Sequence, residues 1–187
     1  WSIDGDGRHL NQLGRWLPTD GQRMAIVSTG LGFTTAMGTI EQTFCLPANA
    51  THIEFDWNFL SEELEEWCGP DHPFDDAFSV ELVWDGGSET IFGIDIDMLC
   101  EGILLRTDLY FDQSGPNCVP TPGAGYATGG NDCKVFGTTW VRAVADISEI
   151  ANVINGDTVT LRFQVTDTGD SIFDTAVLID DVEIITD

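Results

Sequence analysis

Alternating apolar and polar side chains predict β-strands along most of the chain. Between residues 52 and 60 every second side chain is apolar, with aromatic rings at Phe55, Trp57 and Phe59 and polar residues between them. A period of two places alternate side chains on opposite faces of a strand, so that one face is buried. The same pattern, bounded by turn-forming residues, predicts strands at 23–29, 39–46, 52–60, 77–85, 88–96, 103–111, 138–146, 157–167 and 175–185.

The connections between these segments favour an all-β domain. The pair Gly86-Gly87 joins two expected strands as a hairpin, and the segment 148–153 is the one stretch that resembles a helical turn. The sequence contains no internal repeat and no sign of a second domain. We therefore expect a single β-sandwich, most simply jelly-roll-like, from residue 21 to residue 187.

Residues 1–20 differ from the rest and form an expected N-terminal arm. The segment is polar and glycine-rich, and its apolar side chains are widely spaced. Such an extended arm either lies along its own domain or docks into a second subunit by adding a strand to a sheet edge. In the second case the residues that would make the intersubunit contact are Trp1, Ile3, Leu10 and Leu13.

The stretch from residue 61 to residue 76 connects two expected strands and is dense in carboxylates. Like charges this close repel one another, and a hard divalent cation with oxygen ligands, calcium first, neutralises them in many extracellular domains. The alternative is a solvated acidic loop in which Ser61 caps a short helical turn. The acidic residues of the stretch are Glu62, Glu63, Glu65, Glu66, Asp71, Asp75 and Asp76.

A second group of carboxylates precedes the last expected strand, in the connection that holds Asp167, Asp170 and Asp174. If this connection lies at the same end of the sandwich as the stretch 61–76, the two segments together supply the six to eight or so oxygens that calcium takes. The alternative is an Asp-rich turn stabilised by its own backbone hydrogen bonds. The expected calcium ligands are Glu62, Glu63, Asp75, Asp76, Asp170 and Asp174.

The net charge disfavours nucleic acid and anionic membranes as partners, and the sequence indicates a secreted protein. The 187 residues include 32 Asp and Glu against 7 Lys and Arg, a net charge of −25 at pH 7, which disfavours nucleic acid and anionic membranes. No apolar run is long enough to span a membrane. The sequence begins at Trp1 without a leader segment, as a mature secreted protein does. We expect a secreted protein, extracellular or on the cell surface.

Five cysteines indicate disulfides in an oxidising compartment rather than a zinc site. Two of them bracket the glycine- and proline-rich loop 112–137, and their pairing would close and brace a loop of about 15 residues. Two bridges among five cysteines can form in about fifteen ways. Our first choice joins Cys118 to Cys133 and our second joins Cys68 to Cys100, which would leave Cys45 either buried or available to another chain.

Both acidic stretches carry matches to a known family. The residues are Phe59-Leu60-Ser61-Glu62-Glu63, Glu66-Trp67, Phe74-Asp75-Asp76-Ala77-Phe78, Thr168-Gly169-Asp170-Ser171 and Asp174-Thr175-Ala176-Val177-Leu178-Ile179-Asp180. In order and spacing they resemble the choice-of-anchor L domains of secreted bacterial surface proteins and, more loosely, the jelly-roll ligand-binding domains of calcium-dependent adhesins. The resemblance covers most of 23–185 and implies a secreted β-sandwich with bound calcium and no known catalysis.

No catalytic constellation emerges from the sequence. The chain lacks a Gly-x-Ser-x-Gly elbow, a His-Glu-x-x-His pair and a phosphate-cradling loop, and its three His residues are scattered. A carboxylate pair such as Glu54 and Asp56 would suit a glycosidase, but acidic pairs are too numerous in this chain to single one out. We expect a protein without enzymatic activity.

Two non-enzymatic functions remain. The leading hypothesis is a calcium-stabilised structural or adhesive protein that self-associates, as a homo-oligomer joined through the N-terminal arm, into a fibre or other extracellular assembly. The alternative is a monomeric adhesin-type module that binds a peptide or a carbohydrate. In that case aromatic side chains such as Trp84, Tyr110, Tyr126 and Trp140 are candidates for stacking on a sugar.

Overall fold

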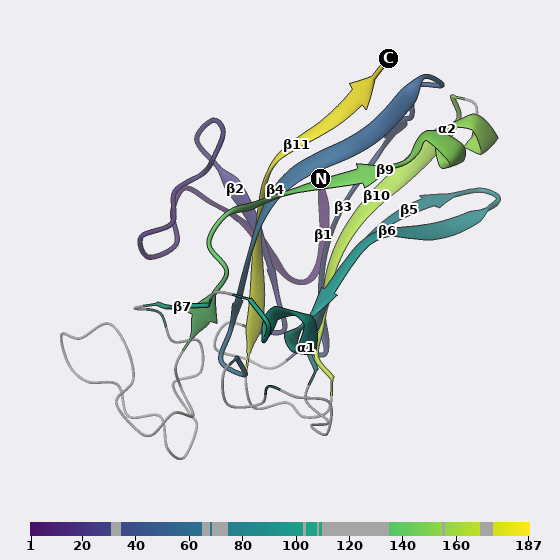
Figure 1. The fold of residues 1–187 in the computed structure, drawn as a ribbon. Helices are drawn as coiled ribbons and strands as arrows, with labels where there is room; N and C mark the ends of the chain where they lie inside the picture. The colour runs from purple at the N-terminus through teal and green to yellow at the C-terminus, as the bar shows by residue number, and fades with distance from the viewer. Residues whose placement is uncertain are drawn as a thin grey trace.

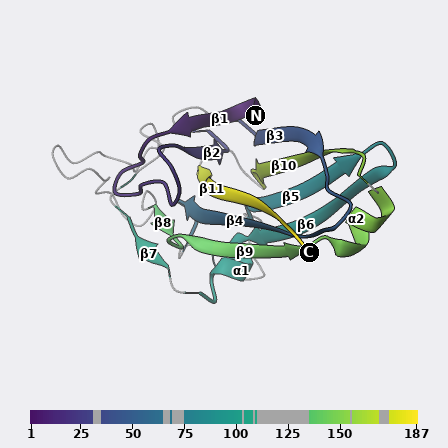
Figure 2. The same cartoon turned by 90° about the horizontal axis from the view of Figure 1, so that it is seen from above.

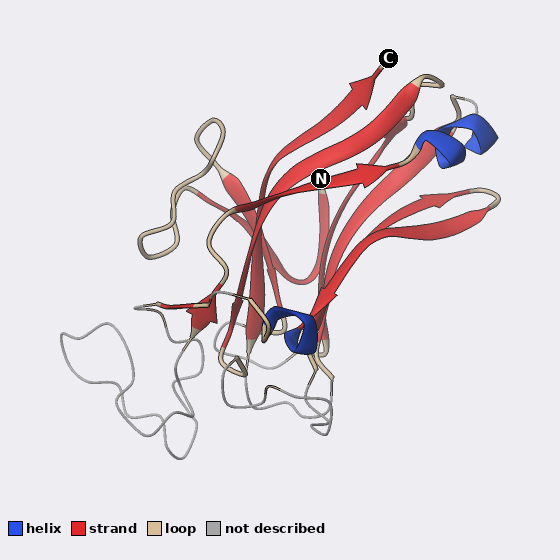
Figure 3. Cartoon of the chain, viewed as in Figure 1, coloured by secondary structure: helices blue, strands red, loops and turns tan. Residues whose placement is uncertain are grey.

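The computed structural model describes residues 1–30, 35–64, 68, 75–102, 104–107, 109, 135–154, 156–168 and 174–187. These residues form an all-β structure with two short helices (Figures 1 and 3). The strands are β1 (Ser2–Leu10), β2 (Met24–Ser28), β3 (Met37–Cys45), β4 (Ala50–Ser61), β5 (Ala77–Trp84), β6 (Gly87–Asp95), β7 (Leu105–Arg106), β8 (Phe136–Gly137), β9 (Val141–Asp146), β10 (Thr158–Thr166) and β11 (Thr175–Thr186). The helices are α1 (Ile96–Leu99) and α2 (Ser148–Ile154).

The strands form two antiparallel sheets packed face to face, which confirms the predicted jelly-roll-like β-sandwich. The first sheet has the order β6-β5-β10-β3 and ends with residues 2–5 of β1. The second sheet begins with residues 6–10 of β1 and continues through β2, β11 and β4. Both β8 and β9 pair with β4, and β9 lies beside it in Figure 2. Strand β1 therefore belongs to both sheets.

A sharp bend at Gly5 lets β1 change sheets. Gly5 has a φ of 65°, and a Cβ atom there would lie 2.1 Å from the carbonyl oxygen of Met37, so only glycine fits. The next residue, Asp6, is buried and accepts hydrogen bonds from Ser28 and Arg8. In Figure 1 the strand runs down from the N-terminus, curves and rises again. Its two halves thus line opposite walls of the sandwich.

The core between the sheets is rich in aromatic rings. Phe55 of β4 lies edge-on to Phe163 of β10, with the ring centroids 5.3 Å apart, and edge-on to Phe78 of β5 at 6.5 Å. Trp57 of β4 contacts Phe92 of β6 at 5.5 Å. These inward positions are the apolar half of the alternating pattern, because a period of two turns every second side chain toward the opposite sheet.

A second apolar cluster covers the outer face of the second sheet. Ile26, Leu60 and Leu178 point away from the main core, and Leu10, Leu13 and Trp16 pack onto this cluster. The N-terminal arm is therefore part of its own sandwich in this structure, and its first ten residues already pair with strands of the same chain. This placement follows the alternative in which the arm lies along its own domain, and the intersubunit contact of Trp1, Ile3, Leu10 and Leu13 stays a prediction.

One predicted disulfide is confirmed. Cys68 and Cys100 are bonded, with the Cα atoms 5.6 Å apart, and this bond ties the acidic connection after β4 to the end of α1. Cys45 is a free, exposed thiol. The other predicted bridge, Cys118 with Cys133, and the loop that it would brace lie outside the described residues. No helix in the described part of the chain is long and apolar enough to cross a membrane.

Candidate ligand-binding pocket

A pocket of about 440 Å³ opens where the two halves of β1 have diverged. Its lining comes from β3 and β10 of the first sheet, from β2, β11 and His9 of β1 in the second, and from Trp1, Asp20 and Arg23 outside the strands. Buried core residues and exposed polar side chains line it together, so the pocket leads from the surface toward the core. Concave sites of this size that combine apolar and polar lining are typical of small-ligand binding.

The floor of the pocket is apolar and carries an indole ring. Ile40 and Phe163 are buried core residues that border the pocket from the first sheet, and Ile179 borders it from the second. The indole of Trp1 lies against the ring of Phe163, with the centroids 5.9 Å apart and the planes at 49°. Trp1 nevertheless remains 49% exposed, so one of its faces is available to a ligand.

One side of the pocket is acidic, and an irregularity in β11 builds it. The pairing of β11 with β4 shifts register between Asp180 and Glu183, and Asp181 adopts a φ of 47°. Such a bulge re-aims side chains locally. The carboxylate of Asp180 accepts hydrogen bonds from the backbone N–H groups of Thr19 and Asp20, at 2.6 and 3.0 Å. These bonds hold the turn before β2 against the second sheet.

Arg142 neutralises much of this acidic side from the outer face of the second sheet. Its guanidinium lies 2.6 Å from the carboxylate of Asp181 and 2.8 Å from that of Glu183, and it also contacts Glu54 and Asp56. Burial lowers the pKa of Arg142, but hydrogen bonds to Asp56, Asp181 and Glu54 outweigh burial and raise the pKa above its usual value. Arg142 is therefore a permanent cation, and two pocket carboxylates are already engaged.

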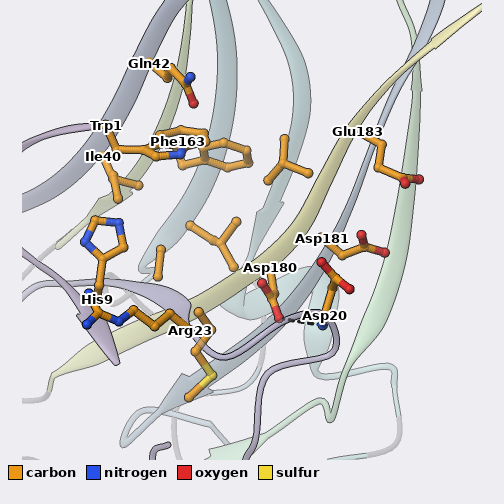
Figure 4. Close-up of a pocket in the computed structure, with 14 residues that line it drawn as sticks. Trp1, His9, Asp20, Arg23, Ile40, Gln42, Phe163, Asp180, Asp181 and Glu183 are labelled. Carbon is orange, nitrogen blue, oxygen red and sulfur yellow. Dashed lines mark hydrogen bonds between the residues drawn. The ribbon is translucent and has the colours of Figure 1, made fainter. Parts of the chain in front are cut away.

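The opposite side of the pocket carries cationic and amide groups. Figure 4 shows His9 and Arg23 together on one side, and Asp20, Asp181 and Glu183 on the other. The side chains of His9, Asp20, Arg23 and Gln42 make no hydrogen bond or ion pair within the part of the chain that the structure describes. They are thus available to bind a ligand that enters between them.

A second, more apolar hollow of about 400 Å³ adjoins the pocket. It shares Trp1, Gln42 and Val182 with the pocket and continues along Phe44 and Ile184. Trp1 therefore lies at the junction of the two hollows, and a ligand longer than the pocket can extend past the indole.

The expected calcium ligands fall at the other end of the sandwich. Glu62 and Asp174 are joined by two hydrogen bonds, from the N–H of each residue to an oxygen of the other, both 3.3 Å long. Asp76 accepts a hydrogen bond from the N–H of Thr168 at 2.9 Å. The connections after β4 and after β10 therefore meet, which is the condition set for a shared site. The carboxylate residues Glu62, Glu63, Asp76 and Asp174 are buried.

The ion itself stays a prediction. Among the described residues, no three His, Cys, Asp or Glu side chains are arranged to hold a metal, and Asp170 lies outside those residues. Desolvation by burial is the main reason why the pKa of Asp75 is raised; the N–H of Asp97 counteracts it, and the charges of Asp95 and Asp97 add to it. The raised pKa of Asp75 thus follows from burial and neighbouring charges.

Sequence patterns do not lead to the pocket residues. They place Trp1 in an intersubunit contact, and His9, Asp20, Arg23 and Gln42 carry no motif. The pairing of β1 with both sheets brings them together, and that pairing has no local sequence signal. Of the expected sugar-stacking residues, Trp84 packs partly against the core and Trp140 donates to the carbonyl of Leu17.

Comparison with known proteins gives no family. No family model matches the chain, and no curated protein matches it, so the resemblance to choice-of-anchor L domains gains no support. The similar solved structures include carbohydrate-binding modules. They include TmCBM61 in complex with β-1,4-galactotriose, at 13% identity and a TM-score of 0.44 over 100% of this chain and 88% of the other.

Two further structures are similar to the same degree. The first is CBM28, a carbohydrate-binding module specific for non-crystalline cellulose, at 14% identity and a TM-score of 0.43 over 90% of this chain and 79% of the other. The second is a structure of promiscuous carbohydrate-binding modules of the β-sandwich superfamily, at 10% identity and a TM-score of 0.46 over 98% and 54%. At these identities and TM-scores the similarity concerns general architecture, and a ligand for this chain has to follow from its own residues.

Proposed function

We propose that the chain is a secreted, non-catalytic carbohydrate-binding module whose ligand occupies the pocket between the two halves of β1. The observation that carries this proposal is the combination of one half-exposed indole, Trp1, with four polar side chains that have no partner among the described residues. A sugar ring has an apolar C–H face and an edge of hydroxyl groups. An aromatic ring packs on the face, and carboxylate, amide, imidazole and guanidinium groups bind the hydroxyls.

The proposal replaces the fibre as the leading hypothesis. The N-terminal arm would have to leave its own sandwich to join a neighbour, because residues 2–10 are paired on both sides of the bend within the chain. The disulfide between Cys68 and Cys100 supports an oxidising, extracellular compartment. A binding module requires only the pocket of a single chain and no second subunit.

Calorimetric titration with soluble oligosaccharides, together with a glycan array, tests the proposal. We expect Trp1→Ala to weaken binding about 10- to 100-fold, because a stacked aromatic ring contributes roughly 1–3 kcal/mol. Trp1→Phe should recover part of the affinity. Trp84→Ala is the matched control, since Trp84 borders neither hollow. Equal loss in the Trp1 and Trp84 variants, or no saccharide bound by the wild type, would contradict the proposal.

A further inference from the structure

Arg23 stands apart from the other described arginines. In a chain with 32 acidic residues and 7 basic ones, a guanidinium that finds no carboxylate is unusual. The remaining arginines with described side chains are all engaged: Arg8 with Asp6, Arg15 over the ring of Trp16, Arg142 with four carboxylates, and Arg162 with Glu41 and Glu81. Arg23 has neither an ion pair nor a ring contact within the described residues, and it lines the pocket.

The fold fixes the backbone position of Arg23, and its side chain is exposed. Arg23 directly precedes β2, and the turn that leads to it is held by the two backbone hydrogen bonds to Asp180. In Figure 4 its side chain lies on the same side of the pocket as His9, away from Asp181 and Glu183. The guanidinium is therefore presented to the pocket that Arg23 lines.

The carboxylates of the opposite side are engaged but remain net negative. Asp181 and Glu183 share the single guanidinium of Arg142 with two further carboxylates, and Asp180 accepts hydrogen bonds from two N–H groups. The carboxylate of Asp20 has no partner among the described residues. Arg23 and His9 lie on the side of the pocket away from Asp181 and Glu183, where an anionic group meets less repulsion than it would beside those two carboxylates.

We propose that the saccharide bound in this pocket is anionic, with its charged group on Arg23 and His9 and its ring on Trp1. This inference rests on the proposed function and narrows it. A guanidinium binds a carboxylate or a sulfate through two parallel hydrogen bonds, which gives both affinity and orientation. Asp20 and Gln42, which also line the pocket, then bind hydroxyl groups of the same sugar. The shared chemistry is an acidic sugar, either a uronic acid or a sulfate ester.

Calorimetric titration of the full chain with three oligosaccharides of equal length tests the inference. The probes are an oligogalacturonate, a sulfated oligogalactan and a neutral oligogalactan. We expect an anionic probe to bind at least about tenfold more tightly than the neutral one, and Arg23→Gln to remove that advantage, about 10- to 100-fold. Arg23→Lys should keep part of it. Arg162→Gln, on the outer face of the first sheet, should leave all affinities unchanged.

The outcomes separate the inference from the function on which it rests. Preference for the galacturonate assigns a uronic acid, and preference for the sulfated probe assigns a sulfate ester; both support the inference. Equal binding of all probes, lost in Trp1→Ala but kept in Arg23→Gln, overturns the inference and retains the carbohydrate-binding module. If no saccharide binds, the proposed function fails; binding of a peptide C-terminal carboxylate that depends on Arg23 would then replace the sugar with a peptide.

Discussion

At the scale of single residues, Arg142 forms ion pairs with four carboxylates, more than any other arginine with a described side chain. Its guanidinium lies within 3.2 Å of the carboxylates of Glu54, Asp56, Asp181 and Glu183. Four carboxylates around one cation leave a net negative cluster, so the arginine reduces repulsion among its neighbours as well as pairing with them. Removing it leaves those carboxylates facing one another across β4 and β11.

We expect Arg142→Ala to lower the free energy of unfolding by about 2 kcal/mol at low salt. The loss should shrink in high salt, because screening weakens the repulsion among the four carboxylates. Chemical denaturation at two ionic strengths measures both effects. Arg162→Ala is the control, since Arg162 contacts only two carboxylates, at 3.0 and 3.6 Å. Equal destabilisation by the two substitutions would contradict the special role of Arg142.

At the scale of elements, the bend in β1 depends on one glycine. A Cβ at Gly5 meets a carbonyl oxygen at 2.1 Å in a backbone conformation that favours glycine. We expect Gly5→Ala to cost about 2 kcal/mol or more, from strain and clash together. Thermal or chemical unfolding measures the loss.

Substitutions at two other glycines separate the effect of backbone strain from that of the steric clash. Gly21 has a φ of 63°, but a Cβ atom added there would have no neighbour within 4 Å, so Gly21→Ala should show strain alone, about 1 kcal/mol. Gly93 has neither the unusual φ nor a close neighbour, and Gly93→Ala should change stability by less than about 0.5 kcal/mol. A Gly5→Ala protein as stable as Gly93→Ala would show that β1 does not need this bend.

The acidic connections at the far end of the sandwich carry the calcium prediction. If calcium binds there, a concentration 100 times its Kd raises the free energy of unfolding by about 2.7 kcal/mol. Glu62→Gln should abolish that gain, while Glu89→Gln on β6 should not. Thermal unfolding with calcium and with excess chelator gives the comparison. Identical curves for the wild type would exclude a structural calcium ion.

The alternating pattern predicted the strands that have one face in the core. It did not predict β1, the strand that joins the two sheets. In β10 the alternation is regular throughout, and in β4 it is regular from Ile53 to Trp57, after which both faces of the strand are buried. In β1 the strand changes sheets at Gly5, so its burial follows no single period. Within the expected strand 103–111, the described residues form only the two-residue strand β7.

The pocket could not be predicted from the sequence, because it too depends on how the strands pair. Its lining comes from five strands whose neighbours in space are distant in sequence, such as His9 beside Ala25 and Ala25 beside Ile179. The sequence offered the meeting of the two acidic connections only as a condition, and the pairing of Thr175 with Ser61 and of Thr166 with Ala77 brings the connections to one end of the sandwich.

At the scale of the whole molecule, the first ten residues decide whether the sandwich closes. Deleting residues 1–10 removes the strand that pairs with β3 and with β2 and exposes the edges of both sheets. We expect the shortened chain to lose cooperative unfolding and to aggregate, as measured by calorimetry and light scattering. Ile3→Ser, at a position that is 42% exposed, should behave like the wild type. A folded monomer after the deletion, from a wild type that assembles, would restore the intersubunit arm.

Because Trp1 directly precedes the first half of β1 and His9 lies on the second half, the pocket has a mechanical weak point. The first half of β1 is an edge strand held to β3 by a ladder of four residue pairs, from Ser2 with Glu41 to Gly5 with Gly38. Tension applied at residue 1 would peel that ladder while the aromatic core between β4, β5 and β10 stayed intact. A tethered molecule under flow would then release its ligand well before it unfolded, and could take it up again once the load fell.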